Sequence, residues 1–201
     1  PKTSSSISSA GGFKMIGAFP VDAFSNISSV TQLQLINLPG LTGPFPDVFY
    51  LTNLFEFVMV GLPAMTGGMS DMSALSSLNI FSVASVPFVG PFPNFPAASV
   101  STVTIDTTNF GSALPIAYCA LVRNGTSVQI THNPLLSGVP SCFLACRLQL
   151  ISIDCTIGFN GICVIGENYN DDLIAPGPIR LADTNHCTGD APRPCRIVRD
   201  N

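Results

Sequence analysis

The sequence predicts a solenoid of stacked parallel β-coils, and two observations support this fold. A six-residue unit of the type Leu-x-Gly-x-Phe-Pro recurs seven times, with consecutive copies starting 22 to 26 residues apart. From the second copy onward, a segment with apolar residues at its first, fourth and sixth positions precedes each unit, except that a weaker segment with only the last two of these positions precedes the sixth unit. Such a period is typical of solenoids, in which each repeat forms one coil and neighbouring coils bury each other's apolar face.

The six-residue units are expected to be turns. Most of them combine a glycine, which adopts positive φ without strain, with a proline, which restricts φ. We therefore expect each unit to reverse the chain. The units are residues 15–20, 41–46, 65–70, 88–93, 110–115, 135–140 and 159–164.

The apolar segments are expected to be short strands. In all but one of them the last three residues alternate apolar and polar, so a strand there places its apolar side chains on one face. A lone strand cannot bury that face, whereas stacked copies form a parallel sheet. The apolar positions are Val30/Leu33/Leu35, Leu54/Phe57/Met59, Leu78/Phe81/Val83, Val100/Val103/Ile105, Val128/Ile130 and Leu148/Ile151/Ile153.

Residues 13–165 resemble the leucine-rich repeat family, in a divergent form of its plant-type class, whose units read Leu-x-x-Leu-x-Leu followed by Leu-x-Gly-x-Ile-Pro. The resemblance implies about seven coils with an irregular or 3₁₀ convex side. The chain departs from the family because only one copy keeps the family's Asn three residues past the strand, and the paired-cysteine N-terminal cap is missing. The residues at the Asn position are Leu38, Leu62, Val86, Thr108, Asn133 and Thr156.

Both ends differ from the repeats. Residues 1–12 are a Ser-rich lead-in with few apolar residues, so we expect the first coil to be incomplete. Residues 166–201 are richer in charge and proline, contain Cys187 and Cys195, and are expected to form a disulfide-stapled C-terminal cap.

Charge is scarce. Only 10% of the 201 residues are charged, and no Lys or Arg lies between Lys14 and Arg123. Nucleic-acid binding requires clustered basic residues, so that class of function is excluded. Ser, Gly, Pro or Asn interrupts every apolar run before the roughly 18 residues of a membrane-spanning helix, so no transmembrane segment is expected.

The cysteines and sequons indicate export. Asn26 and Asn124 begin N-glycosylation sequons, and Asn185 begins a weaker one. Disulfides and glycans both belong to secreted proteins. No Cys-x-x-Cys pair occurs, so no metal site is expected. The odd number leaves one thiol that either cross-links subunits or is buried and free. The disulfide candidates are Cys119, Cys142, Cys146, Cys155, Cys163, Cys187 and Cys195.

No catalytic constellation is evident, so we expect neither an enzyme nor a cofactor. His132 is interpreted as a loop residue, and His186 abuts Cys187, which is better explained as a disulfide partner than as a nucleophile. Asp171 and Asp172 end an amide-rich segment that suits either Ca²⁺ or a solvated turn, but it lacks EF-hand spacing.

In leucine-rich repeat proteins the strand face is the concave recognition surface. Here its expected outward residues are small, uncharged, and mostly hydroxylated or amide-bearing, and the chain has no Trp. Because protein hot spots are rich in Trp, Tyr and Arg, a tight protein receptor is disfavoured, whereas a weak or glycan-directed contact is not. The binding candidates on this face are Gln34, Phe55, Glu56, Thr104 and Gln129.

The sequence favours an extracellular structural glycoprotein whose charge-poor coils are covered by other copies, in a fibril or surface layer, or by glycans. Its partners are then copies of itself and covalent glycans. The alternative is a recognition module, such as a receptor ectodomain or an inhibitor of a secreted enzyme, that binds protein or carbohydrate. A third hypothesis treats the Ser/Thr-rich strand face as an ice-binding or mineral-binding plane.

Overall fold

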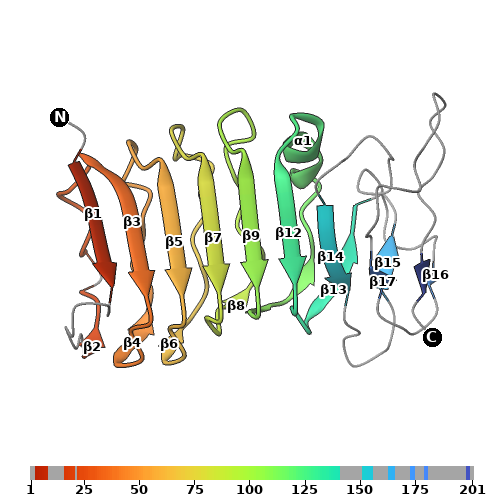
Figure 1. Ribbon diagram of the computed structural model, residues 1–201, viewed down its shortest axis with the longest axis horizontal. Coiled ribbons are helices and arrows are strands. Elements are labelled where there is room, and N and C mark those ends of the chain that lie inside the picture. Colours follow the sequence, from red (N-terminus) through yellow and green to blue (C-terminus); the bar gives the residue numbers. More distant parts are fainter. Residues whose placement is uncertain are drawn as a thin grey trace.

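Two series of parallel strands alternate along the chain and stack into a β-solenoid (Figure 1). The computed structural model describes residues 3–8, 16–20, 22–140, 151–155, 163–165, 173–174, 179–180 and 198–199. About five full turns lie within these ranges. The longer series forms one ladder of seven parallel strands: β1 (Thr3–Ser8), β3 (Val30–Ile36), β5 (Glu56–Val60), β7 (Ile80–Ala84), β9 (Thr102–Asp106), β12 (Ser127–Thr131) and β14 (Ile151–Cys155).

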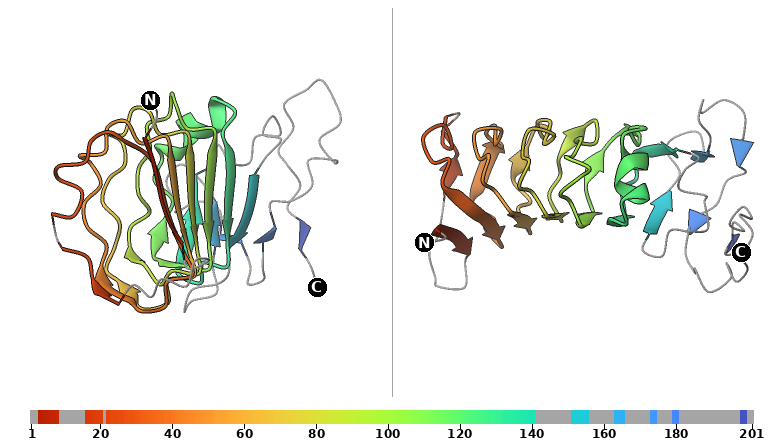
Figure 2. Two further views of the ribbon diagram at one scale, coloured as in Figure 1. Left: turned by 60° about the vertical axis from the view of Figure 1, so that its left-hand side comes forward. Right: turned by 90° about the horizontal axis from the view of Figure 1, so that it is seen from above.

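The register of this ladder places equivalent residues of successive coils side by side. Leu33, Phe57, Phe81, Val103 and Val128 form one continuous row. Their side chains are all buried, as the apolar alternation predicts. The solenoid therefore has one core that runs from Phe24 to Leu136, and the strands lie side by side along its long axis (Figures 1 and 2).

Aromatic rings fill the middle of this core. Phe57 and Phe81 stack with ring centroids 5.3 Å apart and planes 6° apart, and Phe95 packs on Phe81 edge-on at 4.7 Å. Burying a side chain of this size contributes about 1.5–3 kcal/mol. On the other side of the core, the chain before each strand consists of consecutive turns that bury every third residue, such as Leu51 and Leu54.

In the coil that ends in β12, helix α1 (Tyr118–Arg123) takes the place of the turns that precede the earlier strands, and the repeat pattern does not predict this helix. The Tyr118 side chain is fully buried, and its hydroxyl donates to the Pro93 carbonyl at 2.9 Å. Burial raises the pKa of this phenol well above its ordinary value. Cys119 in the same helix is buried and disulfide-bonded.

The chain reverses at a left-handed residue directly after β3, β5, β7, β9 and β12. Five successive coils have positive φ there: Asn37 (54°), Gly61 (66°), Ser85 (56°), Thr107 (51°) and His132 (52°). The backbone N–H of each of the first four donates to the carbonyl of the last strand residue of the next coil, at 2.8–3.0 Å. We call these five positions the left-handed row.

The expectation that the six-residue units are the turns was wrong. They form the second series of strands, which are short and also pair in parallel from coil to coil. Their glycines still need positive φ, as in Gly43 (81°) and Gly67 (79°). The series comprises β2 (Gly17–Ala18), β4 (Leu41–Pro44), β6 (Met65–Thr66), β8 (Val89–Gly90), β10 (Asn109–Phe110), β11 (Ser112–Ala113), β13 (Leu136–Val139) and β15 (Cys163–Ile165).

The Ser-rich start of the chain is part of the sheet rather than a lead-in. Strand β1 pairs with β3 in parallel, and Ile7 lies opposite the buried Leu35. Backbone pairing requires no apolar side chains, so the low hydrophobicity of residues 1–12 does not exclude a strand there. Among the described residues, β1 is the terminal strand of this sheet.

The parallel pattern ends near the C-terminus. Three short strands, β16 (Leu173–Ile174), β17 (Ile179–Arg180) and β18 (Val198–Arg199), pair in antiparallel fashion, with β15, β14 and β17 respectively. Most of the segment expected as a cap lies outside the described residues, as do Cys142, Cys146, Asp171, Asp172, Asn185, His186, Cys187 and Cys195. Crossing a membrane requires a length and apolarity that no helix in the described ranges has.

Candidate functional site

The outward face of the long-strand sheet contains four of the five binding candidates selected from the sequence, and the fifth, Phe55, directly precedes β5. Gln34, Thr104 and Gln129 belong to one row across this face, with Val58 and Ser82 between them. The row thus mixes amide, aliphatic and hydroxyl side chains. This mixture disfavours the uniform hydroxyl plane that ice or mineral binding would need.

The structure joins Gln34 and Glu56 in one polar cluster at the N-terminal part of this face. Gln34 Nε2 donates to Glu56 Oε1 at 2.8 Å, and Gln32 Nε2 donates to Glu56 Oε2 at 3.0 Å. Phe55, directly before Glu56, exposes 46% of its surface. The cluster presents one negative charge, held between two amides, beside an exposed aromatic ring.

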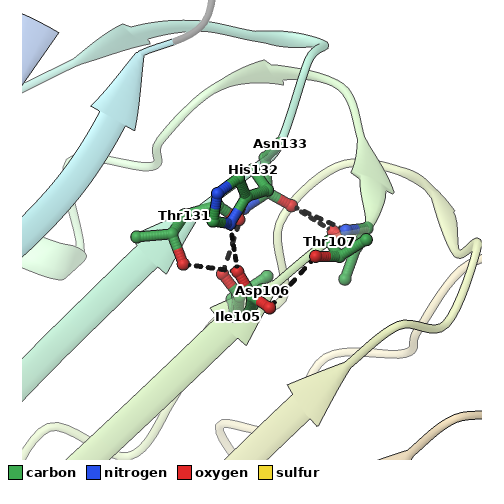
Figure 3. A network of polar contacts seen from close by, with 7 residues as sticks. Ile105, Asp106, Thr107, Thr131, His132 and Asn133 are labelled. Carbon is green, nitrogen blue, oxygen red and sulfur yellow. Dashed lines mark hydrogen bonds and ion pairs between the residues drawn. The ribbon is translucent and has the colours of Figure 1, made fainter.

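A second polar cluster lies where β9 and β12 end (Figure 3). Asp106 Oδ1 accepts a hydrogen bond from Thr131 Oγ1 at 2.6 Å and lies 2.7 Å from His132 Nδ1, while Thr107 Oγ1 donates to Asp106 Oδ2 at 3.0 Å. Burial alone would raise the pKa of Asp106, but these hydrogen bonds and the imidazole outweigh it and hold the pKa below its ordinary value. The carboxylate is therefore a fixed anion.

His132 is the exposed member of this cluster, since 69% of its side chain is accessible against 29% for Asp106. It belongs to the left-handed row, as does Thr107. The sequence identified His132 only as a loop residue, and nothing in its local pattern indicates that Asp106, 26 residues earlier, is its partner. Only the coil-to-coil register brings the two together.

Behind this cluster, a buried polar pair replaces the apolar contacts of the earlier coils. Asn133 and Thr108 are 0% and 2% exposed. Asn133 Nδ2 donates to the carbonyls of Ile105 at 3.0 Å and Thr131 at 2.7 Å, and Asn133 Oδ1 accepts from the Thr108 hydroxyl and N–H. The single Asn that matches the leucine-rich repeat pattern thus ties two coils together.

A groove of about 370 Å³ runs along the left-handed row. It crosses four coils, from Pro63 to His132 and Pro134. Its lining combines proline rings with hydroxyl, amide and imidazole groups: Pro63, Ser85, Pro87, Thr107, Thr108, Asn109, His132 and Pro134.

The chemistry of the two clusters favours binding or structural roles. At the second cluster, both neighbouring hydroxyls donate to the Asp106 carboxylate, which is the pattern of a network that fixes strand ends. In the part of the chain that the structure describes, no three His, Cys, Asp or Glu side chains come together as metal ligands.

No family model matches the chain, and no curated protein or solved structure is significantly similar to it. The leucine-rich repeat resemblance therefore stays an interpretation of the repeat pattern, and a function must be argued from the geometry of the coils.

The two sequons within the described residues differ in their surroundings. Asn26 lies in an exposed turn before β3, and Ile27 and Ser28 are exposed with it. Asn124 is exposed, but its Nδ2 donates to the Ala97 carbonyl at 2.8 Å, and Thr126 is buried with its hydroxyl 2.7 Å from the Val100 carbonyl.

Proposed function

We propose that this chain is a non-enzymatic, extracellular structural glycoprotein of the leucine-rich repeat type. Its coils are covered by neighbouring copies, in a fibril or surface layer, and by glycans. The disulfide framework and the C-terminal cap belong to the same proposal, because both fit an exported solenoid.

The scarcity of free charge on the described coils supports this proposal most. Residues 15–122 contain no Lys or Arg and only five carboxylates. Three of these carboxylates accept hydrogen bonds from neighbouring side chains: Glu56 from two glutamines, Asp106 from two threonines, and Asp71 from Asn94. Net charge and mixed surface charges normally keep proteins apart, so a surface of this kind favours association or a carbohydrate coat.

The test is a concentration series of the secreted protein, followed by negative-stain microscopy and sedimentation, with intact mass measured before and after deglycosylation. We expect assemblies that grow with concentration, added glycan mass, or both. Isolated monomers at every concentration, combined with the mass of the bare polypeptide, would refute the proposal.

Charges placed on the sheet face sharpen this test. Ser82 and Thr104 are neighbours on the outward row, so Ser82→Lys/Thr104→Lys puts two like charges on the contact surface without touching the core. We expect the double variant to remain monomeric where the matched Ser82→Thr/Thr104→Ser variant assembles. Equal assembly of both variants would exclude the sheet face as the contact.

The Glu56 cluster favours a second candidate, a recognition module. An amide-held carboxylate beside an exposed Phe55 offers hydrogen-bond acceptors and an apolar ring to a ligand. Binding by a monomeric protein that is lost in Glu56→Ala or Phe55→Ala, but kept in Thr104→Ser, would favour this candidate over the structural one. A screen against neutral glycans and proteins of the secreted material supplies the ligands.

A further inference from the structure

Three exposed apolar side chains lie on two neighbouring turns that precede β3 and β5. Ile27, Phe49 and Tyr50 expose 41%, 42% and 43% of their surface. The rings of Phe49 and Tyr50 lie against each other with centroids 3.9 Å apart. The described residues contain eight exposed large apolar side chains, so this patch holds three of the eight.

Two contacts place these turns side by side. Asn53 Nδ2 donates to the Ser28 carbonyl at 3.0 Å, and the backbone N–H of Phe55 donates to the Thr31 carbonyl at 2.8 Å. Because Gln32 lies opposite Glu56, the two coils are offset by 24 residues. Tyr50 therefore occupies in its coil the place that Asn26 occupies in the coil before it.

We propose that Asn26 carries an N-linked glycan whose first sugars pack on Phe49 and Tyr50, and that this site is occupied in preference to Asn124. The inference rests on the proposed secretion of the protein. The C–H face of a pyranose ring is apolar and covers aromatic surface as other apolar groups do. A sugar attached to Asn26 starts in the coil next to the two rings, and an uncharged glycan needs no basic residue to hold it.

The Asn124 sequon is hydrogen-bonded to the preceding coil at both of its ends. Its amide nitrogen, which a glycan would modify, already donates to Ala97, and its Thr126 is 4% exposed and hydrogen-bonded to the preceding coil. An enzyme that modifies Asn124 must therefore act before this coil closes. The Asn26 sequon carries no such restriction, because all three of its residues are exposed.

The experiment is secretory expression in a eukaryotic cell, followed by glycopeptide mass spectrometry and thermal unfolding. Ser28→Ala removes the Asn26 sequon and leaves the Ser28 carbonyl for Asn53, while Ser28→Thr keeps the sequon as the matched control. Each is made in the native sequence and in Phe49→Ser/Tyr50→Ser. We expect occupancy at Asn26 to exceed that at Asn124. We also expect Ser28→Ala to lower Tm by about 2–4 °C in the native sequence and by less than about 1 °C without the aromatic pair.

The outcomes separate this inference from the proposed function. Occupied Asn26 with the same Tm loss in both backgrounds would overturn the sugar–aromatic contact and leave the glycoprotein intact. Higher occupancy at Asn124 would overturn the preference. Secretion with no glycan at either site would overturn the whole inference, whereas self-assembly, tested by microscopy, would stand independently.

Discussion

One buried position differs between two halves of the solenoid. The coils that end in β5 and β7 fill it with apolar side chains, whereas the coils that end in β9 and β12 fill it with polar side chains. At the inward position after the left-handed row, Leu62 and Val86 fill the earlier coils, whereas Thr108 and Asn133 fill the later ones. All four residues are buried, and the backbone path is the same, since the left-handed residue precedes each of them. The solenoid thus tolerates either apolar contact or a satisfied hydrogen-bond network at this position.

The apolar region should lose the most when its central ring is removed. Phe81→Ala deletes a fully buried side chain that packs on Phe57 and Phe95, and we expect a loss of about 3–5 kcal/mol in the free energy of unfolding. Chemical denaturation measures it. Phe81→Leu, which keeps most of the side-chain volume, is the control. If it loses as much as Phe81→Ala, the shape of the ring rather than its volume determines the free energy of unfolding here.

In the polar region, Asn133→Ala should be nearly as costly, at about 2–3 kcal/mol, because it leaves the Thr108 hydroxyl and the Ile105 and Thr131 carbonyls without the amide that bonds them. The same denaturation series measures the loss. A loss below about 1 kcal/mol would mean that these groups find other partners.

The shared turn can be tested in the apolar region. Gly61 has φ 66°, and a Cβ there would lie 2.5 Å from Asn37 Oδ1. We expect Gly61→Ala to cost about 1–3 kcal/mol. The matched control is Ser85→Ala, in which a Cβ already occupies the equivalent left-handed position, and its cost should stay below about 0.5 kcal/mol. Equal losses would indicate that the crowding at Asn37 has no effect.

Converting the polar region to the apolar pattern should cost less than breaking it. Thr108→Val/Asn133→Leu removes both side-chain partners together, and we expect a loss of less than about 1.5 kcal/mol. Both variants lose the Asn133 bonds to the Ile105 and Thr131 carbonyls, so a double variant less stable than Asn133→Ala would show that the introduced valine and leucine side chains do not fit the space in these coils. Thermal unfolding of Thr108→Val/Asn133→Leu and of Asn133→Ala, measured in parallel, shows which variant is less stable.

The smallest expected effect is on pH dependence. The pKa of Asp106 is lowered in the folded protein, so its contribution to stability is complete above its ordinary value of 3.8 and is lost as the pH falls through the lower folded pKa. Tm of the native protein should fall as the pH drops below about 4, and Asp106→Asn should make this fall smaller. The control is Thr131→Ser, which keeps a hydroxyl to donate to Asp106 and should leave the fall unchanged; an equally smaller fall in both would remove Asp106 as the cause.

The repeat period and the apolar alternation were sufficient to predict the parallel ladder and its buried residues. They were insufficient for the turns, because glycine and proline favour a break in regular structure without specifying where the chain turns. The left-handed row has five different residue types, so no single residue indicates it. The glutamine pair at Glu56 and the Asp106–His132 contact escaped prediction because their members lie 22 to 26 residues apart.

The sequence by itself determined that this protein stacks equivalent segments at a period of about 24 residues, because apolar side chains on one strand face are stable only when the next copy covers them. The tertiary structure decided which side chains of different coils meet. Register sets those contacts, and a shift of one residue would exchange the two faces of the sheet. The polar clusters, the groove along the left-handed row, and the aromatic pair beside Asn26 all follow from that register.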